Sequence, residues 1–149
     1  MAKKAKAKKS VKKSKSNSKS KNKGSVLKSI WAFIAGFFTV ALLSVATDTV
    51  LEALKVFPPI SQPQALLPWM LALALVYRTI FTVLGGYVTA ALAPRNPMNH
   101  VRFLGVFGLV MAIFGCVAFW SFGNHWYPVA LAVLSYPSVW YGGKLKTKK

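Results

Sequence analysis

Three charged residues in apolar surroundings are the strongest candidates for chemistry in this chain. Asp48 and Glu52 are the only two acidic residues among 149, and their spacing of four places them on one face of a helix. Arg78 is the only charged residue between positions 56 and 94. A charge inside an apolar span is costly and usually faces a partner within the protein. We therefore predict an intramembrane Asp48–Arg78 ion pair, with Lys55 as the candidate partner of Glu52.

Depth along the two helices supports this pairing. If the spans end near Leu54 and begin near Leu66, Asp48 lies about 9 Å and Arg78 about 18 Å from those ends at 1.5 Å per residue. Helical side chains lean toward the N-terminus of their own helix, so the two side chains lean toward each other in antiparallel helices. The pair has two interpretations: a structural clasp between helices, or a substrate or proton site.

The other polar residues do not form a recognisable catalytic or metal-binding set. His100 and His125 are separated by a single apolar span, which would put them on opposite sides of a membrane, and Cys116 is the only cysteine. This set has neither the ligands of a metal site nor a nucleophile with a base and an orienting group. We expect no metal, no cofactor and no enzymatic activity. The secondary polar candidates are Glu52, Tyr77, Thr82, Thr89, His100 and His125.

The elements that carry these residues are predicted to be membrane-spanning helices. Hydrophobic residues make up 54% of the chain, whereas twelve of its twenty basic residues lie between Lys3 and Lys28. A bilayer core of about 30 Å needs roughly 20 apolar residues of helix. The spacing of charges and prolines predicts an all-α integral membrane bundle of four transmembrane helices. The spans are expected at about residues 28–54, 66–92, 101–120 and 126–143 within a domain over residues 26–143.

The two ends of the chain are basic and are expected in the cytoplasm. Residues 1–25 are almost wholly Lys, Ser, Ala and Asn, which predicts a disordered tail, and residues 144–149 form a short basic C-terminus. Lys and Arg favour cytoplasmic loops, and only Lys55 falls on the proposed outer side. The first span is thus expected to be an uncleaved anchor rather than a signal peptide. The tail would contact anionic lipid headgroups, and it lacks the aromatic residues that would stack on nucleic-acid bases.

A stripe of small and hydroxyl-bearing residues marks one face of the second predicted span. Thr82, Gly85 or Gly86, Thr89 and Ala93 follow Arg78 at steps of three and four residues. Small residues let helices approach closely in lipid, so we expect this face in the bundle interior. Gly108 and Ala112 offer a matching face on the third span, as do Ala32 and Gly36 on the first.

One segment resembles a known family. Residues Gly85 to His100 carry the pattern G-G-Y-x-x-A-x-L-A-P-x-x-P-M-x-H, which is similar to a segment of an uncharacterised family of small bacterial four-span inner-membrane proteins. Asp48, Pro58-Pro59, Tyr77-Arg78, Trp126-Tyr127-Pro128 and Gly142-Gly143 look like the same pattern. The resemblance covers about residues 30–145 and implies four spans and a bacterial inner membrane, without implying a reaction.

Three functions remain open at this stage. The first is a non-enzymatic accessory or scaffold membrane protein held together by the Asp48–Arg78 clasp, bound to a membrane partner or to further copies of itself. The second is a small transporter or exporter working as an oligomer, with Asp48 and Arg78 in the translocation path, since intramembrane charges often mark substrate paths. The third and least favoured is a lipid-modifying enzyme with His100 or His125 as its base. A clasp needs no open cavity, which separates the first function from the second.

Overall fold

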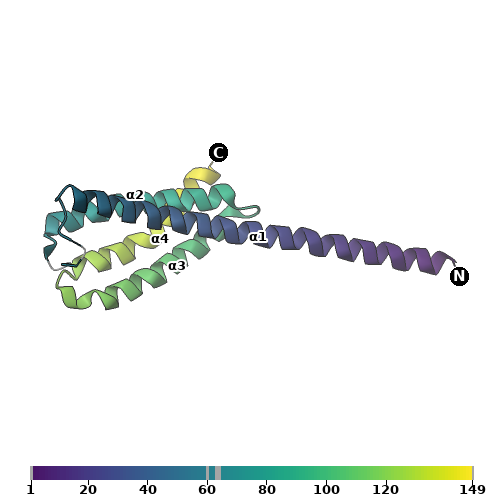
Figure 1. The fold of residues 1–149 in the computed structure, drawn as a ribbon. Coiled ribbons are helices and arrows are strands. Elements are labelled where there is room, and N and C mark those ends of the chain that lie inside the picture. Colours follow the sequence, from purple (N-terminus) through teal and green to yellow (C-terminus); the bar gives the residue numbers. More distant parts are fainter. Residues whose placement is uncertain (1, 60, 63–64, 149) are drawn as a thin grey trace.

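The computed structural model is a helical bundle with one long helix projecting from it (Figure 1). It describes residues 2–59, 61–62 and 65–148, and the side chains from residue 25 onward except Phe122. The elements are α1 (Ala2–Ala53), α2 (Pro68–Leu92), α3 (Pro97–Ala118), the 3₁₀ turn η2 (Trp120–Phe122) and α4 (Trp126–Thr147). The connections at residues 54–67 and 119–125 lie at one end, the loop end, and residues 93–96 lie at the opposite turn end (Figure 1).

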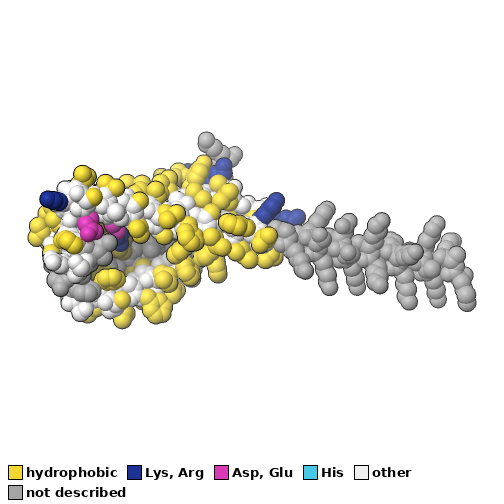
Figure 2. Space-filling view, viewed as in Figure 1, with side chains coloured by type: hydrophobic (Ala, Val, Ile, Leu, Met, Phe, Trp, Pro, Cys, Tyr) yellow, Lys and Arg dark blue, Asp and Glu magenta, His cyan; other side chains and the backbone are white. Residues whose placement is uncertain are grey.

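Three helices of the described chain are long and apolar enough to cross a membrane, which indicates a membrane protein. They cover Ser25–Ala53, Pro68–Leu92 and Pro97–Ala118. Hydrophobic side chains cover the middle of the bundle on the face shown in Figure 2, and Lys and Arg side chains lie toward its ends. α4 is less apolar than α2 and α3, because it contains Ser135 and Ser138 and, in its last turn, Lys144 and Lys146.

The helix ends follow local sequence signals. α2 and α3 each begin with a proline, at Pro68 and Pro97, where a missing N–H costs nothing. Asn96 before Pro97 adopts a left-handed conformation (φ 46°), and this completes the tight turn expected after α2. α3 thus begins four residues earlier than expected. α4 continues to Thr147 rather than ending at residue 143, since lysines in a last turn interact favourably with the helix dipole.

The expectation of a disordered tail is not confirmed, because α1 continues as helix back to Ala2. Lys and Ala both have high intrinsic helix propensity, and the stretch contains no proline. The apolar part of α1, Ser25–Ala53, therefore has no break that separates it from the basic segment. α1 ends at Ala53, and Lys55 takes up a left-handed conformation (φ 58°) directly after it.

Glycines bring α2 into backbone contact with α1 on one side and α4 on the other. A Cβ added at Gly36 would meet the Thr89 hydroxyl, and one added at Gly85 would lie 2.9 Å from the Gly36 carbonyl oxygen. On the other side, a Cβ at Gly86 would meet the backbone carbonyl of Val139, and one at Gly142 would meet that of Val83. The small-residue stripe of α2 therefore faces the bundle interior, where Thr89 is fully buried.

α3 does not use Gly108 in the same way, so the expectation of a close helix contact at this glycine is wrong. A Cβ at Gly108 would meet nothing within 4 Å, and Ala112 is only half-buried. Aromatic rings join α1 and α3 instead: Phe33 lies 5.4 Å from Phe103 and 5.3 Å from Phe107, measured between centroids. These large side chains lie toward the turn end and leave α1 and α3 apart near the loop end.

The same substitution, glycine to alanine, should have opposite effects on stability at a glycine that packs against a neighbouring helix and at one that does not. Gly86→Ala adds a methyl group against the Val139 carbonyl, so we expect a loss of about 1–3 kcal/mol in the free energy of unfolding. Gly108→Ala makes the same chemical change where the space is empty, and the higher helix propensity of Ala should leave stability unchanged or raise it by up to about 1 kcal/mol. Unfolding of the two purified variants in detergent measures both values. Equal stability of the two variants would contradict the packing described for α2.

Candidate functional site

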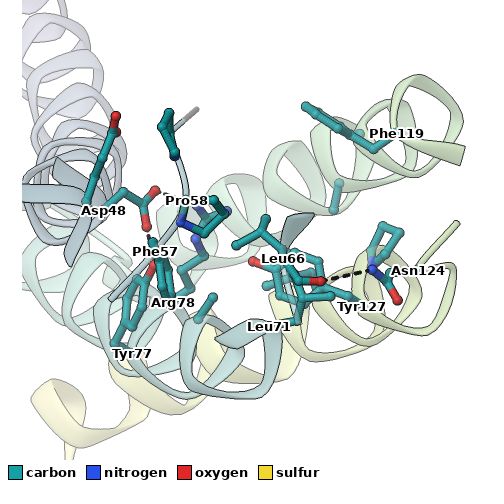
Figure 3. Close-up of a pocket in the computed structure, with 17 residues that line it drawn as sticks. Asp48, Phe57, Pro58, Leu66, Leu71, Tyr77, Arg78, Phe119, Asn124 and Tyr127 are labelled. Carbon is teal, nitrogen blue, oxygen red and sulfur yellow. Dashed lines mark hydrogen bonds and ion pairs between the residues drawn. The ribbon is translucent and has the colours of Figure 1, made fainter. Parts of the chain in front are cut away.

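The structure brings Asp48 and Arg78 together across α1 and α2. Arg78 Nη2 donates a hydrogen bond to Asp48 Oδ2 over 2.6 Å, and this is the only ion pair among the described residues. Tyr77 donates its hydroxyl hydrogen to the other carboxylate oxygen, Asp48 Oδ1. The carboxylate therefore accepts hydrogen bonds from two neighbouring residues of α2, and Figure 3 shows the three side chains in contact.

The pair is only partly enclosed. The side chain of Arg78 is 34% exposed and that of Asp48 is 23% exposed. Arg78 Nε is a buried atom with no hydrogen-bond partner in the described chain. Thr82 does not supply that partner, because its hydroxyl donates to the Arg78 backbone carbonyl at 2.7 Å. The guanidinium group thus keeps hydrogen-bonding capacity beyond its contact with Asp48.

A cavity of about 440 Å³ lies beside this pair at the loop end. All four helices line it: α1 contributes Asp48 and Glu52, α2 contributes residues from Leu71 to Arg78, α3 contributes Ala112 and Gly115, and α4 contributes Tyr127. The connection between α1 and α2 covers part of it with Phe57, Pro58 and Pro59. On the face shown in Figure 2 the surface is hollowed next to the acidic side chains. Pockets of about 300–1,000 Å³ hold drug-sized molecules, so the volume is sufficient for a small ligand.

Another part of the cavity lining comes from the start of α4 and the turn before it. In Figure 3, Asn124 and Tyr127 lie across the cavity from Asp48 and Tyr77. Asn124 donates from its side-chain nitrogen to the Leu66 carbonyl at 3.5 Å, the long limit for a hydrogen bond, which links the two connections at the loop end. The cavity therefore has a charged wall, an aromatic and amide wall, and apolar surfaces between them.

Glu52 lines the same cavity, one helical turn beyond Asp48. It has no salt bridge with Lys55 or with any other described residue, so the expected Glu52–Lys55 pair is not formed. The reason is local: α1 ends between them, and Lys55 lies in the left-handed turn where its backbone N–H donates to the Glu52 carbonyl at 2.9 Å. Lys55 is exposed rather than directed back along the helix.

The remaining candidates from the sequence lie away from this cavity. Thr89 is buried in the contact between α1 and α2, where its hydroxyl donates to the Gly85 carbonyl at 2.9 Å. His100 lies near the turn end against the Asn96 carbonyl, whereas His125 lies at the loop end with its ring 4.3 Å from that of Trp120. No group of three or more potential metal ligands occurs among the described residues.

Residue types alone did not predict the aromatic and amide wall of the cavity. Phe57, Asn124 and Tyr127 have no charge and no distinctive spacing, so only their position in the fold reveals them. The signal available was the resemblance that includes Trp126-Tyr127-Pro128, which marks the start of α4. Tyr127 and Pro128 both line the cavity.

Comparison with protein-family models finds no match, and comparisons with curated proteins and with solved structures also find none. The family resemblance of residues Gly85 to His100 therefore stays a prediction from the sequence. The fold and the cavity are the basis for any functional conclusion.

Removing the carboxylate of the ion pair should destabilise the bundle. Asp48→Asn leaves the Arg78 charge uncompensated and weakens the acceptor for Tyr77. We expect a loss on the order of 2 kcal/mol, below the usual cost of breaking a buried pair because a third of Arg78 is exposed. Glu52→Gln is the matched control, since Glu52 forms no salt bridge, and it should change stability by no more than about 0.5 kcal/mol. Chemical unfolding in detergent measures both.

Exchanging the two charges tests whether the contact between residues 48 and 78 stabilises the fold. Arg78→Asp alone should be destabilising, and combining it with Asp48→Arg should recover more than half of that loss, since the two charges remain within reach of each other. A double variant as unstable as the sum of the two single variants would show that the contact contributes nothing to the fold.

Proposed function

We propose that the chain crosses a bacterial inner membrane four times, with both ends in the cytoplasm. Three helices qualify by length and composition. The fourth, α4, has its less apolar residues in contact with its neighbours: Ser138, Gly142 and Gly143 are buried, and α4 packs against both α2 and α3. The basic residues of the turn end and of the two ends of the chain support the cytoplasmic orientation. In this orientation the Lys-rich start of α1 meets anionic headgroups of the inner leaflet.

Cysteine labelling distinguishes four spans from three. In a Cys116→Ser background, Ser61→Cys and Ser121→Cys lie at the loop end and should react with a membrane-impermeant maleimide in intact cells from which any outer membrane has been removed. Lys148→Cys should react only after the membrane is permeabilised, because it follows α4. Labelling of Lys148→Cys in intact cells would show that α4 does not cross.

We propose further that the protein is a small transporter that binds an amphipathic molecule in the loop-end cavity. The observation that carries this proposal is the cavity of about 440 Å³ with the Asp48–Arg78 pair in its wall. A clasp that serves only packing is best enclosed by apolar neighbours and needs no such space. A charged pair that borders a largely apolar cavity is the arrangement expected for a ligand site. The cavity thus favours the transporter over the accessory or scaffold protein.

The bundle is hollow at the loop end and more tightly packed toward the turn end, as expected for one state of a transporter. Toward the turn end, the glycine contacts of α2 with α1 and α4 leave no room for a side chain. The rings of Phe33, Phe103 and Phe107 pack between α1 and α3, beside a smaller surface hollow of about 220 Å³. With the loop end outside, the described conformation is an outward-open state that gives access to Arg78 from the outer side.

Blocking the cavity tests ligand binding. Gly115 lines the cavity, and a Cβ added there would meet nothing within 4 Å, whereas Val117 on the same helix is 73% exposed and does not line the cavity. Gly115→Phe should fill the cavity and weaken binding of the neutral amphipathic dye N-phenyl-1-naphthylamine by roughly tenfold or more. Val117→Phe also places a phenylalanine on α3, but on its exposed face outside the cavity lining, and should bind the dye like the unaltered protein. Saturable dye fluorescence with purified protein in detergent, corrected for empty micelles, gives the affinities.

Counterflow exchange in vesicles tests transport itself. Vesicles with purified protein and preloaded with a substrate identified by dye displacement should accumulate the labelled substrate faster than protein-free vesicles, and Gly115→Phe should remove the difference. Binding without exchange would leave a binding protein that does not transport. If Gly115→Phe and Val117→Phe bind the dye equally, the cavity is not a site and the accessory or scaffold function is the better account.

A further inference from the structure

The charges around the cavity do not cancel. Three charged residues line it, namely Asp48, Glu52 and Arg78, and no other charged side chain belongs to its described lining. Arg78 and Asp48 neutralise each other across a contact of 2.6 Å. The carboxylate of Glu52 remains, so the cavity carries one net negative charge.

Glu52 has no counter-ion among the described residues. No Lys or Arg of the described chain forms an ion pair with it, and Lys55, the nearest cation in sequence, is held in the turn after α1. Glu52 is half-buried, so its charge is only partly screened by solvent. An unpaired carboxylate beside apolar surface attracts a positive charge more strongly than the same group in water would.

The rest of the lining suits a cation with an apolar body. Aromatic residues from four parts of the chain line the cavity, namely Phe57, Tyr77, Phe119 and Tyr127. The faces of such rings carry negative potential and attract cations. Between them, Leu71, Ala74 and Leu131 offer aliphatic surface to the remainder of a ligand.

An anionic ligand is the alternative, since Arg78 Nε lacks a partner. However, the guanidinium charge is already compensated by Asp48, and an anion at Nε would lie close to two carboxylates. A neutral acceptor, such as an ether or carbonyl oxygen of the ligand, satisfies Nε without that repulsion. The free donor therefore does not require a negative ligand.

We propose that the cavity selects an amphipathic molecule with a single positive charge, with Glu52 as its counter-ion and the Asp48–Arg78 pair as a neutral part of the wall. This inference rests on the proposed transporter function and adds the chemical class of its substrate. It assigns different roles to the two carboxylates: Asp48 maintains the fold, and Glu52 recognises the ligand.

Two probes of nearly the same shape and opposite charge test whether the cavity prefers a cation. Full-length protein in detergent is titrated with tetraphenylphosphonium, a cation, and tetraphenylborate, an anion, with empty micelles as background. We expect saturable binding of tetraphenylphosphonium, at least roughly tenfold tighter than that of tetraphenylborate. Tighter binding of tetraphenylborate would overturn the proposal.

Substitution of Glu52 tests which charge is responsible. Glu52→Gln should weaken tetraphenylphosphonium binding by roughly tenfold and reduce the preference for the cation, whereas Glu52→Asp should keep most of that preference. Lys55→Gln is the control for a general effect of net charge: it removes a charge three residues away that does not line the cavity, and it should change the affinity by less than about twofold. Unchanged binding in Glu52→Gln refutes the role of Glu52, and a melting temperature for each variant verifies that it is folded.

The neutral dye separates failure of this inference from failure of the proposed function. If the dye binds and Gly115→Phe blocks it, but the cation shows no advantage over the anion, the cavity is a ligand site for another class of molecule and only the inference fails. If Gly115→Phe weakens binding of none of the three probes, namely the dye, the cation and the anion, the proposed function fails as well.

Discussion

The close backbone approach of α2 to both of its neighbours is the constraint on which the rest of this structure depends. In a lipid environment no hydrophobic force drives helices together, so packing of small residues and hydrogen bonds must do so. Gly36 and Gly85 allow α1 to contact α2, while Gly86 and Gly142 allow α4 to contact it from the other side. These contacts determine the direction of α1 and α4 relative to α2, and hence where Asp48 and Tyr127 lie relative to Arg78.

The same constraint explains why the bundle is tight at one end and hollow at the other. Helices that meet through glycines are close, whereas helices that meet through phenylalanines are held further apart. α1 meets α2 by the first means and α3 by the second, through Phe33 and its partners Phe103 and Phe107. Beyond the aromatic rings, Ala112 and Gly115 are too small to fill the space between the helices. The cavity thus results from two different distances between packed helices in one bundle.

The ion pair could be predicted from the sequence because the choice was so limited. With two acidic residues in the chain, depth and side-chain direction sufficed to select Asp48 for Arg78. The stripe from Thr82 to Thr89 was also predictable, since helical periodicity shows which residues share a face. Gly108 has the same local appearance as Gly86, yet only Gly86 lies against a neighbouring backbone. Periodicity cannot identify which helix faces that stripe, and neither the cavity nor its wall at Asn124 and Tyr127 could be derived before the helices were placed.

The hollow beside the carboxylates also bears on how a ligand would reach it. It is bordered by α1 and α3, and most of the large side chains exposed on these two helices, such as Leu42, Val45, Ile113 and Val117, are apolar. In a bilayer such surfaces face acyl chains, so a molecule dissolved in the lipid around the loop end could enter sideways without passing through water. Its local concentration would then be set by partitioning into lipid, and its search for the site would be two-dimensional. The apparent affinity of such a protein depends on the membrane as much as on the pocket, and weak contacts suffice for a ligand that the bilayer has already concentrated.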